Sequence, residues 1–172
     1  MKGLLGIIIV FCVFGVPDAF AVKGDDILGF WVTEGGNSRI EIYKTGNNLY
    51  SGKIVALREP TFLSGEVKGM DGKAKVDINN PDNSLRSRPI LGLEIISGFS
   101  FNGEEWGGGK IYDPESGNTY KCKMSIAEDG SLYVRGYIGI SWVGRTTIWH
   151  KDEVYIKSLC KTLSMFGVNC IK

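Results

Sequence analysis

The stretch "TYKCKMSIAEDGSLYVRGYIG", residues 119–139, decides the fold class of this chain. Apolar side chains occupy every second position in both of its halves, which is the period that places them on one face of a β-strand. These apolar positions are Tyr120, Cys122, Met124 and Ile126 in the first half, and Leu132, Val134, Gly136 and Ile138 in the second. Between the halves, "AEDGS" supplies residues that adopt the positive φ of a hairpin turn. The stretch therefore predicts an antiparallel hairpin with one core face and one solvent face.

Similar segments recur about every 8 to 12 residues from Leu28 onward, separated by turns rich in glycine, asparagine and aspartate. We predict strands at 28–34, 39–44, 48–58, 90–100, 104–112, 118–127, 131–138 and 141–150. Because short hairpin turns join most of these segments, the pattern indicates an all-β, eight-stranded antiparallel up-and-down barrel.

The first residues have the layout of a secretory signal peptide. An apolar run at 3–16 is followed by Pro17 and by "AFA" at 19–21. This run of about 14 residues is shorter than a membrane-spanning helix requires, so we predict cleavage after Ala21. The alternative is an uncleaved membrane anchor. Cleavage leaves a barrel domain at 22–152 and a tail at 153–172, in a protein that is periplasmic or secreted.

The overall charge is balanced. Twenty basic and 19 acidic residues give a net charge of +1. This balance gives no electrostatic reason to expect nucleic acid or an acidic membrane as a partner.

The C-terminal tail contains a predicted helix and two of the cysteines. Tyr155, Leu159 and Leu163 recur at helical spacing, which predicts a short C-terminal helix that starts near Glu153, ends near Gly167 and packs on the outside of the barrel. The mature chain contains three cysteines, Cys122, Cys160 and Cys170. An oxidising compartment permits disulfides. We expect the two neighbours in the tail to pair, and the third to remain free and buried.

The longest connection, residues 59–89, contains most of the motif "DINNPDNSLRSRPILG" at 77–92. We predict that Asp77 and Asp82 pair with Arg86 and Arg88, while Asn80 stabilises a turn. Such a clamp would hold one mouth of the barrel in shape. The alternative is that the two arginines bind the anionic head group of a ligand.

Residues suited to catalysis are few. His150 is the only histidine, and the chain has neither a nucleophile elbow nor carboxylates at a metal-binding spacing. Glu104 and Glu105 are adjacent on a predicted strand and therefore point to opposite faces. We expect no enzyme activity, no metal and no cofactor; an enzyme that uses Asp77 and the two arginines is the least favoured reading.

Several motifs together resemble a bacterial exported family, domain of unknown function 2147. They are "GFW" at 29–31, "SGKIV" at 51–55, the motif at 77–92, "WGGGK" at 106–110 and "GRTTIWHK" at 144–151. The resemblance implies a barrel of the lipocalin and calycin type with no established enzymatic activity. In such barrels a tryptophan on the first strand packs against an arginine late in the chain. The resemblance therefore pairs Trp31 with Arg145 or Arg135. Relatives usually end their last strand in W-x-R, whereas this chain has Lys151 at the third position.

A small barrel has room for one ligand, so we predict that the chain binds a small apolar or amphipathic molecule. The predicted contacts are Arg86, Arg88, Trp106, Tyr120, Met124, Val134 and Trp142. The alternative is a filled barrel that serves as an envelope protein-interaction module, using Tyr133, Tyr137 and the tail, as a monomer or a dimer.

Overall fold

The computed structural model describes residues 21–139 and 143–165. Its strands are β1 (Gly29–Val32), β2 (Ser38–Thr45), β3 (Leu49–Leu57), β4 (Glu94–Phe101), β5 (Trp106–Gly107), β6 (Lys110–Asp113), β7 (Asn118–Ile126), β8 (Leu132–Tyr137) and β9 (Gly144–Lys151). Its helices are the 3₁₀ turns η1 (Gly24–Ile27), η2 (Glu34–Gly36), η3 (Gly46–Asn48) and η4 (Asn83–Leu85), and the α-helix α1 (Glu153–Met165).

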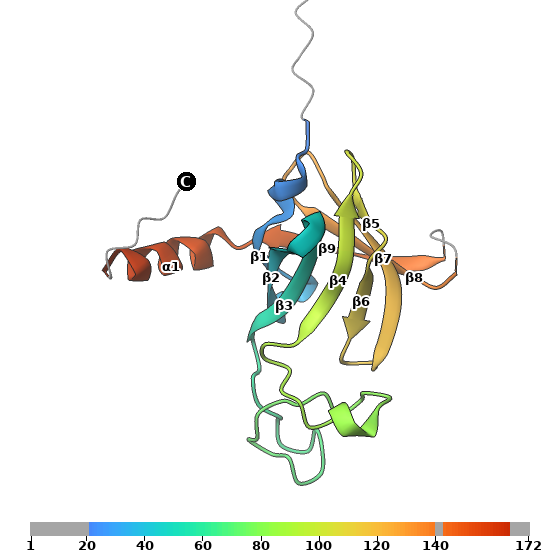
Figure 1. Ribbon diagram of the computed structural model, residues 1–172. Coiled ribbons are helices and arrows are strands. Elements are labelled where there is room, and N and C mark those ends of the chain that lie inside the picture. The colour runs from blue at the N-terminus through green and yellow to red at the C-terminus, as the bar shows by residue number, and fades with distance from the viewer. Residues whose placement is uncertain (1–20, 140–142, 166–172) are drawn as a thin grey trace, which may run out of the picture.

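The strands follow one another around a closed antiparallel barrel, and β9 returns to pair with β1 (Figure 1). Both β5 and β6 lie between β4 and β7, so they are two parts of one broken strand. The nine strand segments of the described residues therefore make an eight-stranded barrel, and the predicted fold class is confirmed.

The break between β5 and β6 makes space for a core side chain. Gly108 has a φ of +79°, and a Cβ on Gly109 would lie only 2.2 Å from the ring of Phe99. Because a side chain at Gly109 would collide with that ring, glycine here lets Phe99 fill the barrel interior.

The barrel interior is one packed hydrophobic cluster. In β7 and β8, alternation places Met124 opposite Val134, and both are almost fully buried. The fully buried apolar side chains are Trp31, Trp106, Phe99, Ile27, Ile40, Ile42, Ile96, Met124, Leu132, Val134 and Cys122. Three large rings in a barrel of this size occupy the space that a ligand would need.

Lys151 lies over the indole ring of Trp31 on β1. The Trp31 indole donates a hydrogen bond to the Ile27 carbonyl at 2.8 Å, and the Lys151 ammonium lies 5.0 Å from its ring centroid. Arg145 is exposed, and Arg135 donates a hydrogen bond to Thr146 on the neighbouring strand; the pairing of either arginine with Trp31 stays a prediction. Lys151 also ties the end of β9 to η1 by donating a hydrogen bond to the Asp26 carbonyl.

Helix α1 is held at its start. Asp152 accepts a hydrogen bond from the Tyr155 backbone at 2.9 Å and forms an ion pair with Arg39, while the rings of Phe30 and Tyr155 lie 5.0 Å apart. Figure 1 shows that the helix then projects away from the barrel, so the expected packing along its outside is corrected. None of the described helices is long and apolar enough to cross a membrane.

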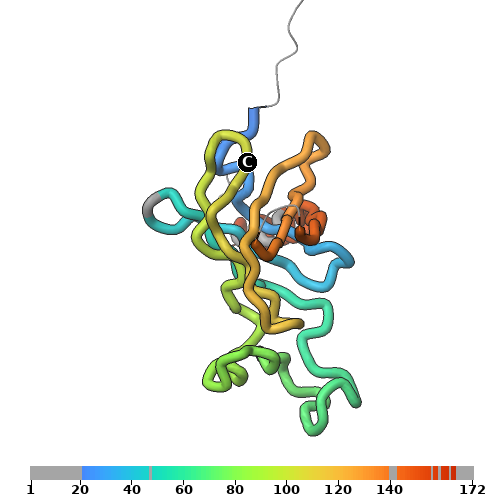
Figure 2. The backbone as a smooth tube through the Cα atoms, turned by 90° about the vertical axis from the view of Figure 1, so that its right-hand side faces the viewer, coloured from blue at the N-terminus to red at the C-terminus, as the bar shows by residue number. Residues whose placement is uncertain are grey.

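The long connection between β3 and β4, residues 58–93, is called the crossover here. Figures 1 and 2 show it as two loops that extend beyond one end of the barrel, opposite η1. Its segments pair with one another through isolated bridges between Thr61 and Ala74 and between Val76 and Pro89. The crossover is therefore an ordered flap.

Candidate functional site

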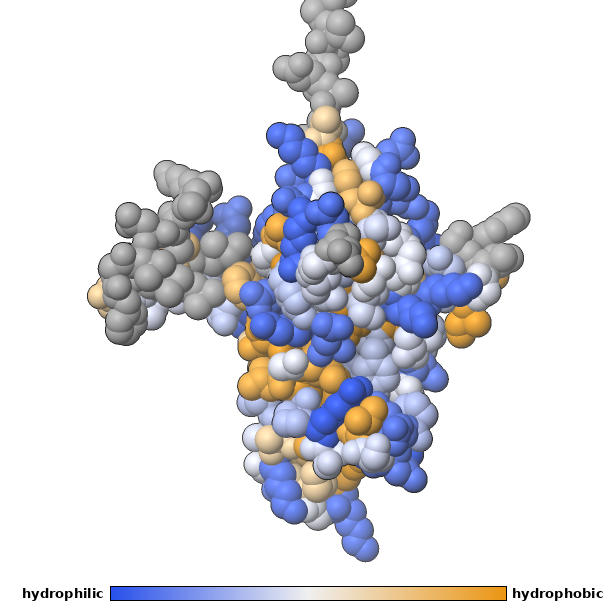
Figure 3. Space-filling view, viewed as in Figure 1, coloured by the Kyte–Doolittle hydropathy of each residue, from blue (hydrophilic) through white to orange (hydrophobic). Residues whose placement is uncertain are grey.

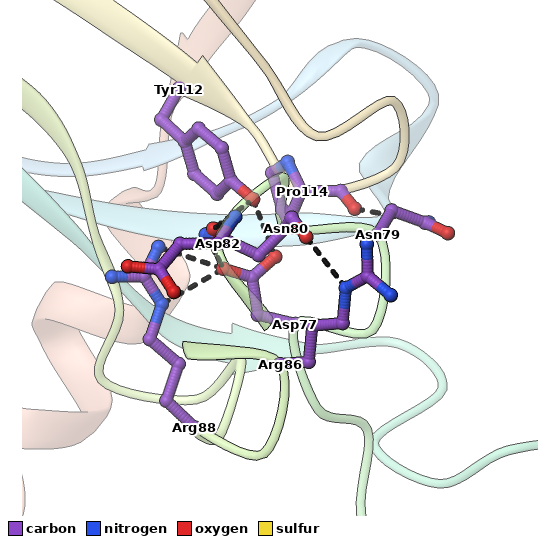
Figure 4. Close-up of polar contacts among 8 residues, drawn as sticks. All are labelled: Asp77, Asn79, Asn80, Asp82, Arg86, Arg88, Tyr112 and Pro114. Carbon is purple, nitrogen blue, oxygen red and sulfur yellow. Dashed lines mark hydrogen bonds and ion pairs between the residues drawn. The ribbon is translucent and has the colours of Figure 1, made fainter. Parts of the chain in front are cut away.

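Asp77 is the centre of the crossover (Figure 4). Its side chain is fully buried and accepts hydrogen bonds from Tyr112 at 2.6 Å and from Asn80 at 2.8 Å. Arg88 donates to the same carboxylate from Nε at 2.8 Å and from a terminal nitrogen at 2.7 Å. Because Tyr112 belongs to β6, this cluster fixes the crossover to the barrel.

The contacts around Asp77 keep its carboxylate ionised. Burial by itself would raise the pKa of Asp77, but the hydrogen bonds from Tyr112, Asn80 and Arg88 outweigh it and hold the pKa below its ordinary value. Burial and the same carboxylate raise the pKa of Tyr112. A charged acid and a neutral phenol therefore share a short hydrogen bond at neutral pH.

The predicted clamp is present, with different partners for two of its members. Asp77 pairs with Arg88 as predicted. Arg86 instead donates to the Asn80 backbone carbonyl at 2.7 Å. Asp82 caps η4 by accepting from the backbone of Ser84 at 2.9 Å. Since both arginines are engaged within the crossover, the structure favours the clamp over direct contact with an anionic ligand.

A second contact fixes the crossover to the turn between β6 and β7. The Asn79 side chain donates to the carbonyls of Pro114 and Glu115, at 3.3 and 2.9 Å. The backbone of Asn79 lies so close to Gly117 that a Cβ on this glycine would be 2.0 Å from the Asn79 oxygen. The two segments therefore meet backbone to backbone.

A pocket of about 420 Å³ lies between the crossover and the end of the barrel. It is called the crossover pocket here. Its lining residues are Asn37, Ser38, Ile54, Leu57, Arg58, Glu59, Phe62, Glu66, Lys75, Val76, Ile78, Asn79, Ile90, Pro114 and Glu115. Ile54 and Ile90 also belong to the barrel core, so the apolar wall of the pocket continues into the core. Figure 3 shows apolar surface where the barrel meets the crossover.

Charged groups surround this apolar wall. Lys75 forms an ion pair with Glu66 at 3.0 Å and lies 6.0 Å from the centre of the Phe62 ring. A hydrogen bond from the Leu63 backbone, together with Lys75, lowers the pKa of Glu66. Arg58 donates to the Gly35 carbonyl. The pocket thus combines an apolar floor with a charged rim, which suits an amphipathic molecule.

The predicted ligand contacts do not line this pocket. Trp106, Met124 and Val134 are packed in the core, and Tyr120 is half-buried on β7. The Trp106 indole donates to the Gly24 carbonyl at 3.1 Å. Trp142 lies outside the described residues.

Sequence reasoning missed the pocket residues because they come from at least five separate segments of the chain. Ile54 and Leu57 end a strand, whereas Phe62, Ile78 and Ile90 are isolated apolar residues in a polar connection. The one available signal was the presence of such residues in a segment otherwise typical of a surface loop.

A second pocket, of about 540 Å³, opens at the opposite end of the barrel beside η1. Two of its charged groups, Asp25 and Lys44, are bonded to one another. Asp25 accepts from Lys44 at 2.8 Å and from Tyr50 at 2.9 Å. These bonds connect η1 to β2 and β3 at this end of the barrel.

Groups suited to chemistry do not converge in the described part of the chain. His150 is exposed, with Nδ1 3.3 Å from the Ser131 hydroxyl. Cys122 is free and buried, and burial raises the pKa of its thiol to about 12. Cys160 is disulfide-bonded; its predicted partner, Cys170, lies outside the described residues. No group of three potential metal ligands occurs among the described side chains.

Comparison with known proteins gives one family and one solved structure. Residues 29–151 match the family model described as "Uncharacterized protein conserved in bacteria (DUF2147)". The fold is similar to that of a Helicobacter pylori protein, HP1028, which is described as belonging to the lipocalin family. The two are 24% identical with a TM-score of 0.61, over 77% of this chain and 87% of the other. No curated protein matches the chain.

Proposed function

The chain belongs to the DUF2147 family and folds as a lipocalin-like barrel, and from this premise we propose that it binds a small amphipathic molecule in the crossover pocket. The observation that carries the proposal is a pocket of about 420 Å³ whose apolar wall is continuous with the core. Small-molecule sites have volumes of about 300 to 1,000 Å³ and are mostly apolar with a few polar groups.

The site that we propose lies at the end of the barrel and not in its interior. The interior is filled by Trp31, Phe99 and Trp106, whereas the crossover pocket opens to solvent. The clamp around Asp77 supports this site indirectly, because an ordered wall loses less conformational entropy when a ligand binds.

The test is titration with N-phenyl-1-naphthylamine, an uncharged dye that brightens in apolar surroundings. We expect Phe62→Ala to weaken dye binding about tenfold, since the ring contributes apolar area that the ligand would cover. Leu63→Ala is the matched control, because Leu63 is the next residue and is 54% exposed outside the pocket.

Thermal unfolding establishes whether each variant is folded. If Phe62→Ala does not fold, Ile78→Ser provides a second pocket variant. Equal binding by the pocket variants and the Leu63 control would contradict the proposal. Absence of dye binding to the unmodified protein would favour the second candidate, an interaction module whose filled barrel is a scaffold. The packed interior is the observation that supports that candidate.

We also propose that the protein is exported and acts in the periplasm or outside the cell. The support is the signal-like sequence before Ala21. Mass spectrometry of the protein from its native host is expected to find Val22 as the first residue; an N-terminus that still carries the leader contradicts cleavage.

A further inference from the structure

The rim of the crossover pocket carries more negative than positive charge. Among the lining residues, Arg58 and Lys75 are basic, whereas Glu59, Glu66 and Glu115 are acidic. The chain as a whole has a net charge of +1, so this acidic excess is a local feature of the rim. A head group that enters the pocket therefore meets a negative field.

Both basic side chains of the rim already have partners within the protein. Lys75 forms an ion pair with Glu66 at 3.0 Å, and its ammonium group lies 6.0 Å from the centre of the Phe62 ring. The Arg58 guanidinium donates a hydrogen bond to the Gly35 carbonyl. An anionic head group would have to compete with these partners for either cation.

Glu59 offers a charge that nothing in the protein neutralises. Its side chain is exposed, and its carboxylate forms no ion pair or hydrogen bond within the described part of the chain. The backbone on both sides is held, because the Arg58 amide donates to the Asn37 carbonyl and the Lys75 amide donates to the Pro60 carbonyl, each at 2.9 Å. This carboxylate is therefore anchored to the rim and available to a ligand.

Glu115, in the turn between β6 and β7, has the same two properties. Its carboxylate is exposed and has no partner among the residues that the structure describes. Its amide donates to the Asp113 side chain at 3.0 Å, and its carbonyl accepts from Asn79 at 2.9 Å, next to the contact of Asn79 with Pro114 in Figure 4. Charged groups on a fixed backbone lose little entropy when a ligand binds.

From this arrangement we propose that the ligand of the crossover pocket is a cationic amphiphile, with an ammonium or guanidinium head group and an apolar tail. The assignment rests on the proposed function, because it specifies the charge of the molecule that the same pocket accepts. The head group pairs with Glu59 and Glu115, and the tail covers the apolar wall that includes Ile54 and Ile90. A few polar groups that orient a ligand beside an apolar wall are typical of small-molecule sites.

The test is displacement of bound N-phenyl-1-naphthylamine by three amphiphiles with apolar tails of similar length, decylammonium, decanoate and decyl maltoside. Each is used below the concentration at which it forms micelles. We expect decylammonium to displace the dye at a concentration about tenfold lower than the uncharged maltoside, because two exposed ion pairs contribute about threefold each. Decanoate should be the weakest of the three, and added salt should reduce the preference for the cation.

A double variant tests the two carboxylates directly. Glu59→Gln/Glu115→Gln should abolish the preference for decylammonium and leave displacement by decyl maltoside unchanged. The matched control is Glu104→Gln/Glu128→Gln, which removes two exposed carboxylates that do not line the pocket and should keep the preference. Thermal unfolding checks that both variants are folded, and the comparison of amphiphiles on the unmodified protein decides the charge preference in either case.

The outcomes separate this assignment from the proposed function. Equal displacement by the three amphiphiles, or tighter binding of decanoate, overturns the assignment. It leaves the proposed function in place as long as Phe62→Ala still weakens dye binding. Equal loss of the preference in the double variant and in its control also overturns the assignment. Absence of dye binding to the unmodified protein overturns both.

Discussion

Asp77 shows how one residue orders a long connection. A carboxylate with no exposed surface is costly unless every oxygen is bonded, and here the bonds come from three directions. Tyr112 belongs to the barrel, Asn80 to the adjacent turn and Arg88 to the far side of the crossover. The charge of Asp77 therefore links segments that are far apart in the sequence.

Asp77→Asn should lower the free energy of unfolding by about 3 kcal/mol at neutral pH, since it leaves Arg88 without its buried partner. The pKa of Asp77 is lower in the folded chain than its ordinary 3.8, so ionised Asp77 stabilises the fold above that value. This stabilisation is lost as the pH falls from about 4 through the folded pKa. Urea unfolding from pH 7 to 3 should show that the difference in unfolding free energy between Asp77→Asn and the unmodified protein becomes smaller as the pH falls.

Asp82→Asn is the control for that series. Asp82 is exposed and caps η4, and asparagine caps a helix as well as aspartate does. Its stability should stay within about 0.5 kcal/mol of the unmodified protein. A difference between Asp77→Asn and the unmodified protein that is constant across the pH range would refute the role given to the charge.

At the scale of elements, the buried face could be predicted for strands with regular alternation but not for those with irregular pairing. The hairpin of β7 and β8 has unbroken register from Ile126 opposite Leu132 onward, so its faces follow from the sequence. In β4 the register shifts against β3, and the fully buried residues are Ile96 and Phe99. Leu93 and Ile95 are buried as well. A bulge depends on the partner strand, and no single segment encodes it.

Within the crossover, the charged motif predicted the Asp77 and Arg88 pair, whereas the pocket was not predictable. Pairing follows from opposite charges within a short segment. The pocket depends on where Phe62, Ile78 and Ile90 come to lie against the ends of β2 and β3. These are long-range contacts, and neither periodicity nor turn chemistry specifies them.

Gly117→Ala should lower the free energy of unfolding by about 3 kcal/mol for two reasons. Alanine is strained at a positive φ, and its methyl group would collide with the backbone of Asn79. Gly117 has a φ of +71°, and its Cβ would meet the Asn79 carbonyl. Gly130→Ala is the matched control, because Gly130 occupies another hairpin turn at a φ of +80° with no atom within 4 Å. It should cost about 1 to 2 kcal/mol. If guanidinium unfolding shows that both variants lose the same unfolding free energy, the crossover does not contact this turn closely.

At the scale of the whole molecule, the barrel closes through a short pairing between its first and last strands, β1 and β9. β1 and β9 pair through two residue pairs only in the described strands, Trp31 with Lys151 and Val32 with His150. The seam is strengthened by the contacts of Lys151 with the Trp31 ring and the Asp26 carbonyl. Opening of the interior therefore requires loss of core packing as well as of hydrogen bonds.

Cys122 should report that opening. Its thiol is buried on β7, and burial raises its pKa to about 12, so almost no thiolate exists in the folded barrel at pH 8. We expect Ellman's reagent to label it only as fast as the molecule unfolds, and at once in denaturant. If the labelling is absent in Cys122→Ser, the signal is assigned to Cys122. Rapid labelling without denaturant would mean that the interior admits solvent.

The position of η1 has a practical consequence for orientation. Residues 21–27 emerge at the end of the barrel opposite the crossover, as Figure 1 shows. A tether joined directly to Val22 would hold the molecule by that end, so the crossover pocket would lie at the end away from the attachment point. Immobilisation through the N-terminus thus presents this pocket outward, while the hairpin of β8 and β9 points along the support.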